Sequence, residues 1–146
     1  VGIASMKKPA ELETLGYRFF SGGDTEVLLK GYHAWGEALL PKLNGMIAFA
    51  IWERDRERLF LARDRLGVKP LFYALLDDGS FLFGSELKSL LAHGGLKRDI
   101  DPCAVEEYFA LGYVAEPRTI FLGAKKLQPG ESLCIRRGQP IPAPKL

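Results

Sequence analysis

The side chains most able to do chemistry in this chain are an aspartate in a glycine-rich segment, two cysteines and two histidines. Asp24 follows Ser21-Gly22-Gly23, a turn-forming run, and precedes residues typical of a helix. An aspartate at this point is a natural N-cap for a helix that begins at Thr25. Its carboxylate is also suited to accept hydrogen bonds from the ammonium group of a ligand. Both roles can hold at once.

The same glycine-rich segment partly matches the S-G-G-x-D-S loop of ATP pyrophosphatases. Backbone N–H groups of a turn that opens a helix can bind phosphate. Relative to that pattern, one residue is missing between Gly23 and Asp24. Short glycine motifs also occur often by chance. We therefore reject a nucleotide-binding interpretation of this segment.

The two cysteines are poor candidates for a nucleophile. Cys103 follows Asp101-Pro102 at the predicted start of a helix, where a thiol can be activated. No histidine is near it in sequence, so we expect a small buried side chain. Cys134 lies in an apolar run typical of a strand in the core. His33 and His93 stand alone and predict no metal site, so we assign no catalytic residue to this chain.

Helices and one strand are expected to surround Asp24. Helix-forming residues run from Pro9 to Leu15 and stop at Gly16. Tyr17–Phe20 reads as a strand. Beyond Asp24, apolar residues recur at helical spacing and should face a core. These residues are Leu28, Tyr32, Trp35 and Leu39.

Between Met46 and Phe83 the pattern changes to strands. The run 46–52 is apolar on both alternating faces, which predicts a strand covered on both sides. Turns at Asp55-Arg56 and Asp78-Gly79 predict an antiparallel meander. Two helices should follow. The first opens at Ser85 or the preceding glycine, runs through Leu90-Leu91 and ends near Gly94-Gly95. The second begins at Asp101-Pro102 and ends at Gly112.

Helices that flank an antiparallel sheet predict an α+β layered domain. Residues 1–137 should form this domain, and the proline-rich residues 138–146 should form a tail or linker. The segment Arg63–Leu71, RDRLGVKPL, joins two predicted strands. Its dense charges and its glycine suggest a salt-bridged loop that fixes strand geometry, so we expect a structural role.

Size and composition favour a single water-soluble domain. The chain has 146 residues, 47% hydrophobic residues and a formal net charge of +2. No Lys/Arg run exceeds two residues, so we expect no nucleic-acid partner. No apolar run is long enough to span a membrane, so we expect no membrane partner. Two distant cysteines and the lack of a signal peptide favour the reducing cytoplasm.

Three phrases of the sequence carry a family resemblance. They are NGMIAFAIWE at 44–53, RDRLGVKPLFY at 63–73 and FGSELKSLL at 83–91. In this order and spacing they resemble the later part of the glutamine-hydrolysing domain of asparagine synthetases, a class II glutamine amidotransferase. The resemblance covers roughly residues 12–137. It implies an incomplete αββα sandwich of the N-terminal-nucleophile hydrolase type.

The resemblance also implies a substrate and a catalytic apparatus. Glutamine would be the ligand, and Asp24 would match the aspartate that binds its α-ammonium group. The family's nucleophile is an N-terminal cysteine, whereas Val1-Gly2-Ile3-Ala4 resembles the family's CGIA opening with valine in its place. The family's oxyanion Asn-Gly and carboxylate-binding arginine have no counterpart, since Asn44-Gly45 belongs to a structural phrase. ATP and Mg²⁺ would belong to a synthetase domain beyond Leu146, so we expect no cofactor here.

Three hypotheses follow for the function. In the first, the chain is a fragment or degenerate relative of this amidotransferase domain and is inactive by itself. In the second, it is a non-catalytic module that kept the fold for binding, with a homo-oligomer covering exposed sheet edges. In the third, the sequence is an incomplete record of a working enzyme.

Overall fold

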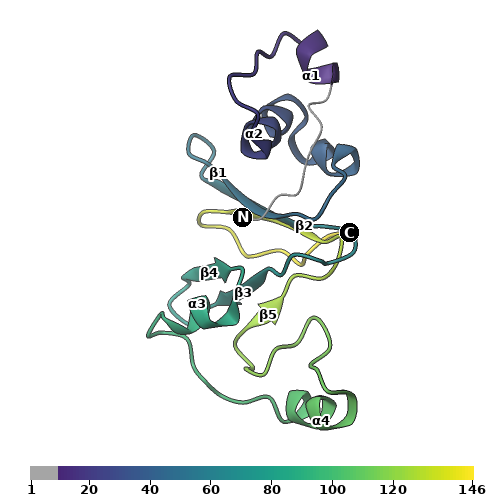
Figure 1. The fold of residues 1–146 in the computed structure, drawn as a ribbon. Helices are drawn as coiled ribbons and strands as arrows, with labels where there is room; N and C mark the ends of the chain where they lie inside the picture. Colours follow the sequence, from purple (N-terminus) through teal and green to yellow (C-terminus); the bar gives the residue numbers. More distant parts are fainter. Residues whose placement is uncertain (1–9) are drawn as a thin grey trace.

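The computed structural model describes residues 10–146. The Val1–Ala4 match therefore lies outside the described residues. Three helical elements come first: α1 (Ala10–Thr14), α2 (Asp24–Trp35) and the 3₁₀ helix η1 (Gly36–Lys42) (Figure 1). Helix α1 ends as expected, because Gly16 adopts a φ of 88° and the amide of Tyr17 bonds the carbonyl of Leu12 at 3.0 Å.

The strand predicted at Tyr17–Phe20 does not form, and that prediction is wrong. The amide of Phe20 donates to the Glu26 carboxylate instead of to a neighbouring strand. For the Phe20 amide, a side-chain acceptor thus takes the place of the carbonyl that a neighbouring strand would supply.

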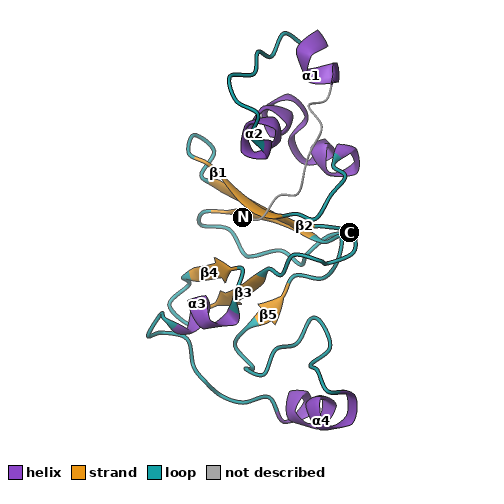
Figure 2. Ribbon diagram, viewed as in Figure 1, coloured by secondary structure: helices purple, strands orange, loops and turns teal. Residues whose placement is uncertain are grey.

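The strands form two antiparallel three-stranded sheets, which differ from the single meander that we predicted (Figure 2). The first sheet has the order β1-β2-β6 and the second has the order β4-β3-β5. The bounds are β1 (Ala48–Glu53), β2 (Arg58–Arg63), β3 (Phe72–Leu75), β4 (Phe81–Gly84), β5 (Lys125–Lys126) and β6 (Ser132–Arg136). Both predicted hairpin turns are confirmed, but β2 and β3 do not pair with each other.

Three apolar clusters show how the layers stack. One cluster joins α2 and η1 to the first sheet and includes Tyr32, Leu39 and Phe60. A second lies between the two sheets, where Leu61 packs near Leu127. The third joins the second sheet to helix α3 (Leu87–Leu91). Strand β1 contributes to both of the first two clusters, so the prediction of a strand covered on both sides is confirmed.

Helix α4 (Pro102–Leu111) stands apart from the sheets (Figure 1). Its predicted cap is confirmed, since the Asp101 carboxylate accepts from the Cys103 amide at 3.0 Å and Gly112 ends the helix at a φ of 79°. Ala104 is its one buried residue. In the predicted tail, Ile141 packs against the cluster between the sheets and Lys145 pairs with Ser132. Among residues 10–146, no helix is long and apolar enough to cross a membrane.

Phe60 should be the most costly core residue to truncate. It is 0% exposed and stacks on Tyr32 at a centroid distance of 5.2 Å. We expect Phe60→Ala to lower the free energy of unfolding by about 3–5 kcal/mol, because the cavity cannot close. Phe109→Ala, at a site that is 84% exposed, is the control and should change it by less than ~0.5 kcal/mol. Urea titration of the two variants measures both values, and equal losses would contradict the assigned core.

Candidate functional site

Asp24, the one ligand-contact residue predicted from the sequence, lies at the first turn of α2. The helix begins one residue earlier than predicted, at Asp24 itself, and Gly23 occupies the N-cap position in an extended conformation. Gly23 has no side chain with which to cap the helix. The N-cap prediction for Asp24 is therefore wrong. Asp24 is half-buried, and the turn Ser21–Gly23 before it is exposed.

Glu26, which sequence reasoning missed, holds this turn in place. Its carboxylate accepts hydrogen bonds from the amide of Phe20 at 3.0 Å, from the amide of Ser21 at 2.8 Å and from the Ser21 hydroxyl at 2.7 Å. The Ser21 hydroxyl in turn accepts from the Gly23 amide at 3.2 Å. In a capping box the glutamate at the third helical position accepts from the N-cap amide, whereas Glu26 accepts from the amides of Phe20 and Ser21, which precede the N-cap residue Gly23. The signal in the sequence that could have revealed this role is the position of Glu26, two residues after Asp24 and within the first turn of the helix.

A lysine and two aromatic rings complete this corner. The Lys30 ammonium donates to the Glu26 carboxylate and to the carbonyl of Arg18. It also lies 4.7 Å from the centre of the Phe19 ring and 5.0 Å from that of Phe20. The hydrogen bond from Lys30, followed by those from Phe20 and Ser21, lowers the pKa of Glu26 from 4.5 to about 2. The turn before Asp24 is thus supported by an ionised carboxylate at neutral pH.

The RDRLGVKPL segment is built around two buried charges. The Asp64 carboxylate accepts from the amides of Leu66, Val68 and Lys69 at 3.1, 2.9 and 3.0 Å. Desolvation alone would raise the pKa of Asp64, but these backbone hydrogen bonds outweigh it and lower the pKa. The structural role that we predicted matches this geometry, although backbone amides rather than basic side chains bind the carboxylate.

Arg63 forms the segment's one salt bridge among the described residues, with Glu116 at 2.8 Å. Its side chain is 5% exposed. The guanidinium also donates to the carbonyls of Gly67 at 2.6 Å, Lys69 at 2.8 Å and Leu127 at 2.5 Å. Arg63 therefore connects the end of β2 with the loop before β3 and with the chain after β5.

A second polar network lies between α2 and the first sheet. The Tyr32 hydroxyl donates to Glu53 at 2.6 Å and accepts from Arg58 at 2.9 Å. Burial and the hydrogen bond with Glu53 raise the pKa of Tyr32 well above its usual range. The hydroxyl therefore stays protonated at neutral pH, and the network fixes α2 on the sheet.

The remaining candidates do not gather around Asp24. Cys103 is exposed, which makes its predicted burial wrong, and Cys134 packs partly buried on the cluster beneath α2. His33 is exposed and shares a 2.6 Å hydrogen bond with the Tyr17 hydroxyl. Within residues 10–146 no group of His, Cys, Asp and Glu side chains could hold a metal ion.

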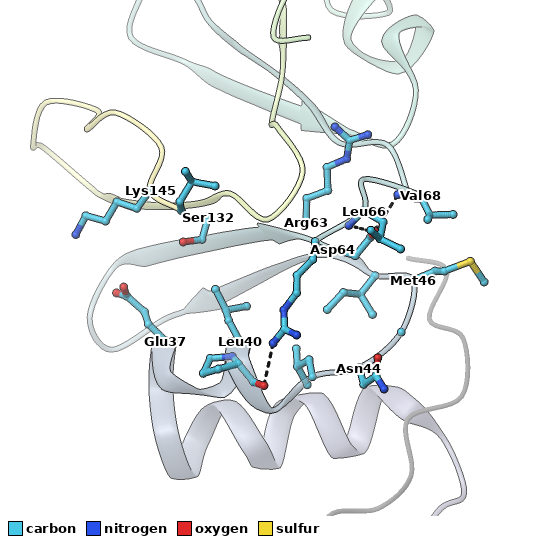
Figure 3. Close-up of a pocket in the computed structure, with 16 residues that line it drawn as sticks. Glu37, Leu40, Asn44, Met46, Arg63, Asp64, Leu66, Val68, Ser132 and Lys145 are labelled. Carbon is cyan, nitrogen blue, oxygen red and sulfur yellow. Dashed lines mark hydrogen bonds between the residues drawn. The ribbon is translucent and has the colours of Figure 1, made fainter.

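A large hollow lies elsewhere, at the end of the first sheet (Figure 3). Its volume is about 710 Å³, and Asp24 does not line it. Arg63 and Asp64 contribute to its wall, together with η1 and the turn before β1. The site predicted from the sequence and this hollow are therefore separate features of the surface.

Comparison with known proteins gives a consistent result. A family model described as a glutamine amidotransferase domain matches residues 5–144. The chain is 48% identical over 128 residues to asparagine synthetase [glutamine-hydrolyzing] 3 of Bacillus subtilis (strain 168), covering 87% of this chain and 21% of that protein. Asparagine synthetase [glutamine-hydrolyzing] 1 of the same organism is 42% identical, covering 86% of this chain and 20% of the relative.

A more distant relative is the amidase chyE of Penicillium rubens, 32% identical over 82% of this chain and 17% of its own length. The chain thus spans about a fifth of the length of the curated relatives that it matches. The resemblance to the glutamine amidotransferase domain of asparagine synthetases, which we inferred from three phrases of the sequence, is confirmed.

The lowered pKa of Glu26 predicts that the free energy of unfolding falls at acid pH. Its pKa of about 2 in the folded chain lies below the ordinary value of 4.5, so its contribution is present above pH 4.5 and lost as pH falls through 2. We expect Glu26→Gln to destabilise the chain at pH 6 and to lose less stability than the wild type between pH 4.5 and 2. Urea titrations at pH 6, 4 and 2.5 measure this difference. Glu13→Gln on exposed α1 is the control, and an identical acid profile for Glu26→Gln and wild type would refute the assignment.

Proposed function

Because the chain belongs to the glutamine amidotransferase domain family, we propose that it is part of the glutamine-hydrolysing domain of an asparagine-synthetase-like protein. Identity of 42–48% to asparagine synthetases supports this choice within the family. The family reaction, glutamine hydrolysis that feeds ATP-dependent amidation of aspartate, is then the activity of the longer protein. ATP and Mg²⁺ would bind outside these residues.

The finer architecture that we propose is the αββα sandwich of the N-terminal-nucleophile hydrolases. The stacking of the clusters supports it, because two antiparallel sheets face each other and helices cover their outer sides. Such a sandwich presents the ends of its strands and the adjoining loops to a substrate.

Asp24 is the residue that we propose to bind the α-ammonium group of glutamine. The observation that supports this assignment is the set of hydrogen bonds by which Glu26 holds the turn just before Asp24 in one conformation. The carboxylate of Asp24 then lies at the start of α2 on a backbone that is fixed before a ligand arrives. A preorganised carboxylate binds an ammonium group with little ordering cost.

We further propose that the 146 residues alone do not hydrolyse glutamine. The reaction needs a thiolate with an adjacent base. Among residues 10–146 the thiols are those of Cys103 and Cys134, and neither forms a hydrogen bond with a histidine.

Glutamine titration tests the role of Asp24. We expect the wild-type chain to bind glutamine by isothermal titration calorimetry and to release no ammonia. Asp24→Asn should weaken binding about tenfold or more, because the ammonium loses a charged acceptor worth at least ~1.4 kcal/mol. Asp55→Asn on the exposed β1–β2 turn is the matched control and should bind normally. Equal affinities for Asp24→Asn and wild type would exclude the proposed contact, and ammonia release would exclude inactivity.

A non-catalytic oligomerising module is the second candidate function, and the surface of α4 favours it. Phe109 is 84% exposed, Tyr113 61% and Tyr108 55%. Aromatic side chains of this size expose several hundred Å² together, and contiguous apolar patches of that area often mark protein interfaces. A second copy that packs on α4 would cover them.

Sedimentation velocity tests whether the chain self-associates through α4. We expect the wild-type chain to self-associate at ~100 µM, a concentration suited to weak interfaces of modest area. Phe109→Glu should shift it to monomer, because the charge would be buried without a partner. Phe20→Glu, at a position that is 90% exposed between α1 and α2, should leave association unchanged. A monomeric wild type would rule out this role for α4.

A further inference from the structure

The hollow at the end of the first sheet has a built, two-sided lining. Its apolar wall comes from three separate segments that the fold brings together: η1, the turn before β1 and the loop after β2. The apolar residues are Leu40, Leu43, Met46, Ile47, Leu66 and Val68. Figure 3 shows Met46, Leu66 and Val68 at one end, with Glu37 and Lys145 at the opposite end. A volume of about 710 Å³ falls within the range of ~300–1,000 Å³ typical of small-molecule sites.

One arginine spans the hollow between its walls. Arg65, an exposed residue that follows β2, donates one hydrogen bond to the carbonyl of Pro41 in η1 at 3.0 Å. Among the described residues its other N–H groups have no acceptor. A guanidinium keeps its charge at every physiological pH and can bind a carboxylate through two parallel hydrogen bonds.

The other charged side chains that line the hollow are Arg63, Asp64, Glu37 and Lys145. The neighbouring Asp64 carboxylate is occupied by its own loop, through the amides of Leu66, Val68 and Lys69. Glu37 interacts with Arg58 at 3.4 Å, whereas the Lys145 side chain adds a cation at the rim. Arg63, Arg65 and Lys145 bring three positive charges to the lining against the two carboxylates of Asp64 and Glu37, and this balance favours an anion.

We propose that this hollow binds a small organic carboxylate with an apolar body. The carboxylate pairs with Arg65, and the apolar body lies along Met46, Leu66 and Val68. Glutamine does not fit this description, because its side chain ends in a polar amide. The proposed ligand is thus different from the substrate of the family, and its site does not include Asp24. A failure of one proposal leaves the other standing.

Octanoate is the probe for this site. We expect the wild-type 146-residue chain to bind octanoate saturably in isothermal titration calorimetry, below the concentration at which the acid forms micelles. Octanol, which has the same chain without the charge, should bind at least about tenfold more weakly. Arg65→Gln should weaken octanoate binding by a similar factor, since it removes a charged donor worth at least ~1.4 kcal/mol.

Two further variants control the experiment. Arg54→Gln removes an arginine from the exposed β1–β2 turn and should leave octanoate binding unchanged. Leu66→Glu places a negative charge on the wall at a side chain that is 84% exposed, so the fold is kept while octanoate is repelled. Circular dichroism confirms that each variant is folded. Absence of saturable octanoate binding to the folded wild type, or equal binding by Arg65→Gln, overturns the proposal.

Discussion

The junction after β2, where two consecutive charged residues are buried, determines how the rest of the structure is arranged. Arg63 is 7% exposed and Asp64 is 5% exposed, yet their polar atoms face opposite sets of backbone groups. Arg63 binds carbonyls and Asp64 binds amides. Burial of either charge without these partners would cost several kcal/mol. The pair therefore admits only a loop that turns the chain from one sheet to the other.

This constraint links the functional features. Because the loop leads away from β2, strand β3 builds a second sheet and an apolar layer forms between the two. The same turn sends Arg65 across the open end of the first sheet, toward η1. The hollow is thus a by-product of how the sheets are connected. Asp24, by contrast, depends on a local clamp at the start of α2.

Much of the fold follows from the sequence because local signals and burial agree. The Asp101-Pro102 cap, the turn at Asp78-Gly79 and the apolar stripe of α2 were all predictable from residue type and spacing. The separation into two sheets was not, since it depends on contacts between Arg63 and residues as distant as Leu127. The start of α2 was misplaced by one residue because Glu26, rather than Asp24, holds the preceding amides. Spacing alone does not distinguish two carboxylates so close together.

The geometry of the loop after β2 also determines which of its positions tolerate substitution. At Lys69 both backbone groups are engaged, the amide by Asp64 and the carbonyl by Arg63, whereas the side chain takes no part in those bonds. Gly67 differs, because its φ is 64° and an added Cβ would lie 2.7 Å from Pro129 and 3.0 Å from the Arg63 guanidinium. Divergent descendants of this sequence could therefore replace Lys69, and even Leu66 and Val68, without changing the path of the chain. Replacement of Gly67 would be strained at this φ even if Pro129 made room, so glycine should persist at this position.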